Sequence, residues 1–143
     1  MDIRMATFLP MTIEAARGAR AKAVLREAGQ TDAAAGECWT ALLAGCARAG
    51  AGLDVRLRRL SEATSVHVGT KWWFTEGAAH RRRVARAQSD IEEALAEGDG
   101  QEFARAFVGY DHAMASAVVC AGGGAPRTPR ESGRTKRTRS PTA

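Results

Sequence analysis

TKWWFTEGAAHRRRVARAQSDIEEALAEGDGQEFARAFVGYDHAMASAVV, residues 70–119, decides the fold of this chain. Two sets of residues in this stretch recur at steps of three and four, which places each set on one stripe of a helix. The first set consists of Trp73, Gly77, His80, Val84, Ala87, Ile91 and Leu95. The second set consists of Phe103, Phe107, Tyr110, Met114 and Ala117. We therefore predict two long antiparallel helices joined at residues 98–100, where Asp99 and Glu102 can cap the second one.

Three further helices are expected before this stretch, over about residues 12–28, 31–49 and 54–64. Thr12, either Thr31 or Asp32, and Asp54 stand where these helices need a capping side chain. A short break over residues 65–69 separates the third helix from the long one. The sequence thus predicts an all-α fold, a four- to five-helix bundle built on the long antiparallel helical hairpin.

Residues 121–143 differ in composition from the rest of the chain. The formal net charge is +5, and before residue 121 fifteen Lys and Arg residues are balanced by fifteen Asp and Glu residues. The whole excess lies in the last segment, which carries six basic residues against Glu131. Because this segment also contains prolines and no large apolar residue, we predict a disordered basic tail. The expected organisation is an extended lead-in over residues 1–10, a helical domain over 11–120 and this tail.

The tail predicts a nucleic-acid partner, since clustered Lys and Arg attract phosphates without regard to sequence. The basic residues that would make these contacts are Arg127, Arg130, Arg134, Lys136, Arg137 and Arg139. The alternative is a solvating tail without a dedicated partner.

The segment over residues 60–70, LSEATSVHVGT, resembles the helix-turn-helix of bacterial repressors. The positions that match this family are Leu60, Ser61, Ser65, Val66 and Thr70. Ser65 stands where glycine is usual, and Lys71 stands where an apolar residue is expected. The resemblance implies that His67, Gly69, Thr70 and Lys71 face the major groove of DNA. A plain connection between two helices is the alternative.

The helix expected over residues 70–97 carries a basic run followed by an acidic run. The basic residues are His80, Arg81, Arg82, Arg83 and Arg86, and the acidic ones are Asp90, Glu92, Glu93 and Glu97. Arg86 and Asp90 have the spacing of an i,i+4 ion pair, which favours a solvated helix face over a phosphate contact. The acids crowd the end of the helix where the macrodipole disfavours them, so they could accept Arg105 or a basic partner.

No arrangement typical of catalysis or metal binding accompanies these charges. The three cysteines have no metal-ligand spacing and are expected to be small apolar core residues: Cys38, Cys46 and Cys120. His80 is expected to be a hydrogen-bonded core histidine, and the side chains of Asp111 and His112 diverge on a helix. We therefore predict a protein that is not an enzyme and holds neither a cofactor nor a metal.

Three adjacent aromatic residues, Trp72, Trp73 and Phe74, provide a possible surface for a protein partner or a homodimer, although ordinary core packing is favoured. Residues 1–11 contain no apolar run of signal-peptide length, and no stretch predicts a membrane span. We expect a cytoplasmic protein, and the excess of Arg over Lys with abundant Ala and Gly is typical of a GC-rich bacterial genome. The leading hypothesis is a small nucleic-acid-associated or regulatory protein. The alternative is a helical interaction or assembly module with no nucleic-acid role.

Overall fold

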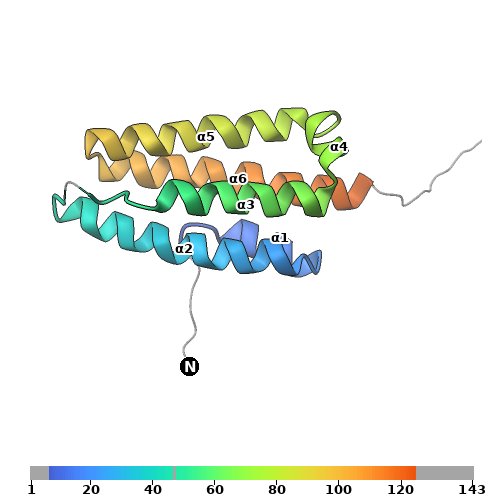
Figure 1. Ribbon diagram of the computed structural model, residues 1–143, viewed down its shortest axis with the longest axis horizontal. Coiled ribbons are helices and arrows are strands. Elements are labelled where there is room, and N and C mark those ends of the chain that lie inside the picture. Colours follow the sequence, from blue (N-terminus) through green and yellow to red (C-terminus); the bar gives the residue numbers. More distant parts are fainter. Residues whose placement is uncertain (1–6, 47, 125–143) are drawn as a thin grey trace, which may run out of the picture.

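The computed structural model describes residues 7–46 and 48–124, which form a bundle of α-helices. The helices are α1 (Pro10–Gly18), α2 (Lys22–Leu43), α3 (Leu53–Val68), α4 (Thr70–Phe74), α5 (Ala78–Glu97) and α6 (Gly100–Gly124). Figure 1 shows the four long helices lying along one another, with α1 beside them and the short α4 at one end. The all-α bundle is confirmed, but the described residues contain six helices rather than four or five. The tail expected over 121–143 lies outside the described residues from 125 onward.

The turn between α5 and α6 follows from local sequence. Gly98 has a φ of 69°, a left-handed conformation that costs glycine nothing. The Asp99 carboxylate then accepts the backbone N–H of Glu102 at 3.1 Å, which caps α6 as predicted. The side chain of Glu102 pairs with Arg105 of the same helix at 3.5 Å. Arg105 therefore does not bind the acidic residues of α5.

The core lies where α6 meets the other helices. All five residues of the predicted α6 stripe are buried: Phe103, Phe107, Tyr110, Met114 and Ala117. Phe8, from the lead-in, enters this core with its ring 5.3 Å from the ring of Phe107 and 5.9 Å from that of Trp39. The lead-in therefore contributes to the core instead of lying outside it.

Two buried carboxylates fasten the start of the chain to the bundle. Asp32 of α2 accepts the backbone N–H groups of Phe8 and Leu9 at 2.7 and 2.8 Å, as well as that of Thr7. Asp111 of α6 accepts the backbone N–H group of Thr12 at 2.7 Å and also that of Met11, and so caps α1. Because each carboxylate accepts several N–H groups, burial does not leave its charge uncompensated.

The predicted boundaries of the first two helices are wrong. The chain breaks at Ala19–Ala21, where Arg20 has a φ of 57°, and α2 then continues through Gly29. Gly29 is exposed, so it interrupts no packing, while the buried stripe on both sides of it holds the helix together: Val24, Ala28, Thr31, Ala35, Cys38 and Leu42. Asp32 is thus inside a helix and not its cap. At the other end, α6 continues past the expected stop near Cys120 to Gly124.

The long helix expected over residues 70–97 is divided into α4 and α5 at Gly77. A Cβ at this glycine would lie within 2.8 Å of ring carbon Cη2 of Trp72, so only glycine allows the ring to pack there. Trp73 is buried, whereas Phe74 is 57% exposed with the Arg81 guanidinium 4.8 Å from its ring centroid. The aromatic triplet therefore divides between core and surface.

Candidate functional site

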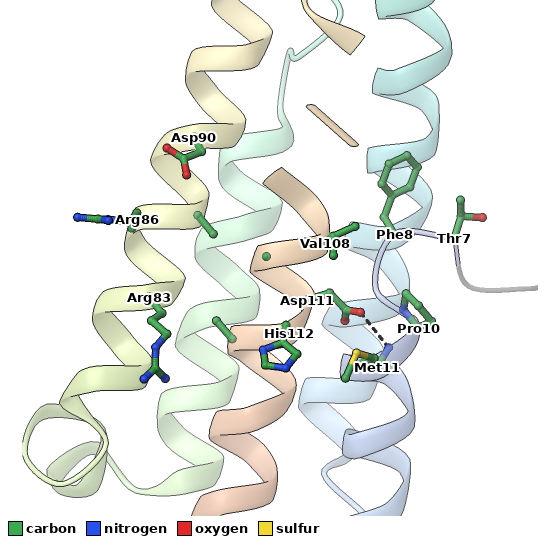
Figure 2. A pocket seen from close by; sticks show the side chains of 13 residues that line it. Thr7, Phe8, Pro10, Met11, Arg83, Arg86, Asp90, Val108, Asp111 and His112 are labelled. Atoms are coloured by element: carbon green, nitrogen blue, oxygen red, sulfur yellow. Dashed lines mark hydrogen bonds between the residues drawn. The ribbon is translucent and has the colours of Figure 1, made fainter. Parts of the chain in front are cut away.

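A cavity of about 660 Å³ lies between α5 and the start of α1, over α6. Figure 2 shows Arg83, Arg86 and Asp90 on the α5 side and Met11 on the α1 side, with Val108 on α6 between them. Asp111 also reaches this cavity, but its carboxylate is already bound to the backbone of α1.

A second cavity, of about 390 Å³, continues along the same two helices toward their turn. The two cavities share Ala87, Asp90 and Gly109. We call the surface formed by both the α5–α6 face. On α5 it consists of Arg83, Arg86, Ala87, Asp90, Glu93, Ala94 and Glu97. On α6 it consists of Glu102, Arg105, Ala106, Val108, Gly109, His112 and Ala113.

The floor of the α5–α6 face is apolar and its small residues leave it open. Ala87, Ala94 and Ala113 are buried in it. Val108 is 70% exposed, and Met11, at its edge, is 49% exposed. At Gly109 an added Cβ would meet nothing within 4 Å. Exposed apolar side chains next to an open glycine position form a surface on which another chain could pack.

The charges that border this floor are segregated along α5. Arg83 and Arg86 lie in the first half of the helix, and Asp90, Glu93 and Glu97 lie in the second half. Within residues 7–46 and 48–124, none of these five side chains forms an ion pair or a hydrogen bond. The expected Arg86–Asp90 pair is therefore not formed.

The charges in the end turns of α5 oppose its dipole. The first turn of α5 contains no acidic residue and its last turn no basic one, the reverse of what the macrodipole favours. Neighbouring like charges, such as Glu93 and Glu97, repel each other at i,i+4 spacing. The charges in the end turns of α5 thus do not stabilise the helix through its dipole.

The helix-turn-helix geometry expected over residues 60–70 is not formed. Ser65 and Val66 lie inside α3, which continues to Val68, so no turn occurs at Ser65. A single residue, Gly69 with a φ of 99°, separates α3 from α4, and α4 has only five residues. The helix continues because Leu57, Leu60 and Thr64 extend one buried stripe along it. Asp54 lies in the first turn of α3, while Gly52 occupies the N-cap.

The residues assigned to DNA contacts are nevertheless accessible where they are described. His67, Thr70 and Lys71 are exposed at the junction of α3 and α4. The six basic tail residues lie outside the described part of the chain. Figure 1 shows that α4 lies at the end of the bundle where α6 finishes.

The remaining candidate groups are the potential metal ligands and the cysteines. Among the described residues, no group of three His, Cys, Asp or Glu side chains could hold a metal ion. Cys38 is buried as predicted, and burial followed by the nearby Glu37 raises the pKa of its thiol. The prediction is wrong for Cys46 and Cys120, which are exposed free thiols.

His80 lies beside the ring of Trp72, with the two ring centroids 5.9 Å apart. Its Nδ1 is buried and has no hydrogen-bond partner among the described residues, so the expected hydrogen-bonded histidine is wrong for that atom. Burial, and then the positive charge of Arg83, lowers the pKa of His80 below its usual 6.5. His80 therefore belongs to the packing of the α4–α5 junction.

Comparison with protein-family models, with curated proteins and with solved structures finds no match for this chain. Among the described helices, none is both long enough and apolar enough to cross a lipid bilayer.

Sequence reasoning missed most of the apolar residues of the α5–α6 face, among them Val108 and Gly109. The signal was present, because Val108 is an apolar residue that lies off the buried stripe of α6. Gly109 is likewise a helix-interior glycine without a neighbour that requires it. Such exceptions to a helical pattern indicate a surface only after the helix has been placed against its neighbours.

Proposed function

We propose that this protein is a helical interaction module and that its α5–α6 face binds another polypeptide. The observation that carries the proposal is the charge pattern of α5. The five charged side chains that α5 contributes to the face form no ion pair or hydrogen bond within the described chain, and the charges in the end turns of α5 oppose the helix dipole. A binding partner of complementary charge would form the ion pairs that these side chains lack within the described chain.

The dimensions and chemistry of the face favour a polypeptide over a small molecule. From Arg83 to Glu97 the charged edge extends about 21 Å, at about 1.5 Å per residue. Its two signs of charge are separated along this length, and its floor is apolar. An amphipathic helix presents an apolar stripe bordered by charges over the same length, which makes helix-in-groove packing the expected mode of binding.

A photo-cross-linking amino acid at position 108 tests the proposal. In cells that express the full chain, this variant should form a covalent adduct with a polypeptide, which mass spectrometry identifies. The matched control carries the same amino acid at Val66, which is 75% exposed on α3, away from the face. Adducts that form equally at both positions, or at neither, would contradict an interaction at the α5–α6 face.

Nucleic-acid association is a second candidate function. The observation that favours it is the location of the excess charge, since residues 121–143 hold six basic residues against one acidic residue. His67, Thr70 and Lys71 are exposed at the end of the bundle where α6 finishes, so they could add contacts to the same phosphates.

A gel-shift titration of the full chain across a salt series tests this second function. If all six basic residues meet phosphates, the logarithm of affinity falls with that of salt concentration at a slope of about −5. Replacing these six residues by Gln should abolish the binding, while Lys71→Ala should reduce the slope by about 1. Absent or salt-insensitive binding by the wild-type chain would refute this candidate.

A further inference from the structure

We infer that the polypeptide bound at the α5–α6 face is a second copy of this chain, packed antiparallel about a two-fold axis. This inference rests on the proposed function, because it names the partner of the same face. Its starting point is that one α5 helix carries both signs of charge, in separate halves.

A two-fold axis perpendicular to α5 turns this segregation into complementarity. The axis lays α5 of one copy antiparallel along α5 of the other, so each cationic half meets the anionic half of its partner. An isologous interface requires a surface that is complementary to itself. A parallel arrangement would bring like charges together, which disfavours association.

The two cavities fix the register of this arrangement. They share Ala87, Asp90 and Gly109, so these residues mark the middle of the face. An axis that passes α5 at this level places Arg86 opposite Asp90 of the second copy, and Arg83 opposite Glu93 of the second copy. Each pair occurs twice by symmetry, which gives a partner to four of the five unpaired charged residues that α5 contributes to the face.

The floor of the face suits the close approach that this arrangement needs. Gly109 lies in the middle of α6, where glycine is less favourable for the helix than alanine. No contact within the described chain requires it, because an added Cβ would meet nothing within 4 Å. In the antiparallel arrangement α6 of the second copy crosses near this point, and the exposed Val108 becomes covered. The α5 and α6 helices of both copies then form an intermolecular four-helix bundle.

Charge reversal tests the inference through the oligomeric state, measured by sedimentation equilibrium on the full chain. One variant carries Arg83→Glu with Arg86→Glu, and the other carries Asp90→Arg with Glu93→Arg. Each alone should weaken self-association by at least about 100-fold, since every facing pair becomes a like-charge pair. An equimolar mixture of the two should form a heterodimer, and all four substitutions in one chain should restore the homodimer.

The matched control is Arg59→Glu with Glu62→Arg on α3, two exposed positions outside the face. This control should dimerise as the wild type does, and circular dichroism of every variant should retain its helical content. A second measurement uses Gly109→Ala, which should weaken association at least about tenfold although it favours the helix. Gly29→Ala, at an exposed position on α2 with equally open surroundings, should leave association unchanged.

The outcomes separate this inference from the proposed function. A wild-type chain that remains monomeric up to about 1 mM overturns the second copy as the partner. A dimer that survives both charge reversals overturns it as well. If position 108 then cross-links to a different protein, the interaction function stands and only the identity of the partner is wrong. If the chain is monomeric and position 108 forms no adduct, both fail.

Discussion

The region around α1 and the exposed face of α5 use charge in opposite ways. Around α1, the carboxylates of Asp32 and Asp111 are buried, and each accepts backbone N–H groups of residues far away in the sequence. Along α5, Arg83, Arg86 and Asp90 are exposed, and no side chain or backbone group of the described chain binds them. The buried carboxylates of Asp32 and Asp111 therefore stabilise the fold, whereas the exposed charged side chains of α5 remain available for a contact with another molecule.

Removing an enclosed charge should have the largest effect. Asp32→Ala leaves the backbone N–H groups of Phe8 and Leu9 buried without an acceptor, which should lower the free energy of unfolding by about 3 kcal/mol. Urea denaturation measures this change. Asp90→Ala, which removes the same group from α5, should change the free energy of unfolding by less than about 0.5 kcal/mol. If Asp32→Ala and Asp90→Ala lowered the free energy of unfolding equally, buried and exposed carboxylates would not differ in their contribution to the fold.

Gly77 and Gly29 differ in packing as the two carboxylates differ in burial. Gly77 faces the ring of Trp72, so Gly77→Ala forces that ring to move and should destabilise the chain by about 1–3 kcal/mol. Gly29→Ala, in open surroundings, should instead stabilise it by up to about 1 kcal/mol. Thermal unfolding followed by circular dichroism measures both. If Gly77→Ala were neutral, Trp72 would not need the close approach seen at this turn.

Sequence reasoning succeeded where the signal is local. The cap at Asp99 and the buried stripe from Phe103 to Ala117 depend on residues three or four positions apart, and both are formed. It failed where the partner is remote. Asp32 looked like a helix cap because nothing nearby shows that its oxygens bind residues 23 to 25 positions earlier.

Gly29 and Ser65 show why helix ends were misplaced. Each has a weak helix preference, and each is overridden because buried residues before and after it continue one stripe. The α5–α6 face was hidden for a related reason. The sequence shows which charges could pair, as Arg86 and Asp90 could, but only the packed helices show that they do not.

The charge of the unpaired Arg83 can also be measured through its effect on the pKa of His80. Burial is the main cause of the low pKa of His80, and the positive charge of Arg83 is the second. Arg83→Gln should therefore raise the pKa of His80 part of the way toward 6.5, as followed by NMR titration of the imidazole. A histidine with a lowered pKa favours folding above pH 6.5 and loses that contribution as the pH falls, so this variant should also lose less stability in acid. Arg82→Gln is the control, and an unchanged His80 in Arg83→Gln would mean that the Arg83 charge is neutralised by another group.

The smallest effect on the free energy of unfolding is expected at Glu97, at the end of α5. Whether this free energy rises or falls decides whether the Glu97 charge supports the fold. Glu97 lies in the last turn, where its charge opposes the helix dipole, and it has no partner in the described chain. Glu97→Lys should therefore raise the free energy of unfolding by about 0.3–1 kcal/mol at low salt, and Glu97→Gln by about half as much. Urea denaturation of dilute protein measures the difference before copies associate, and the gain should shrink as salt screens it. A loss of stability in Glu97→Lys would show that this carboxylate already supports the fold, and α5 would then resemble the α1 region after all.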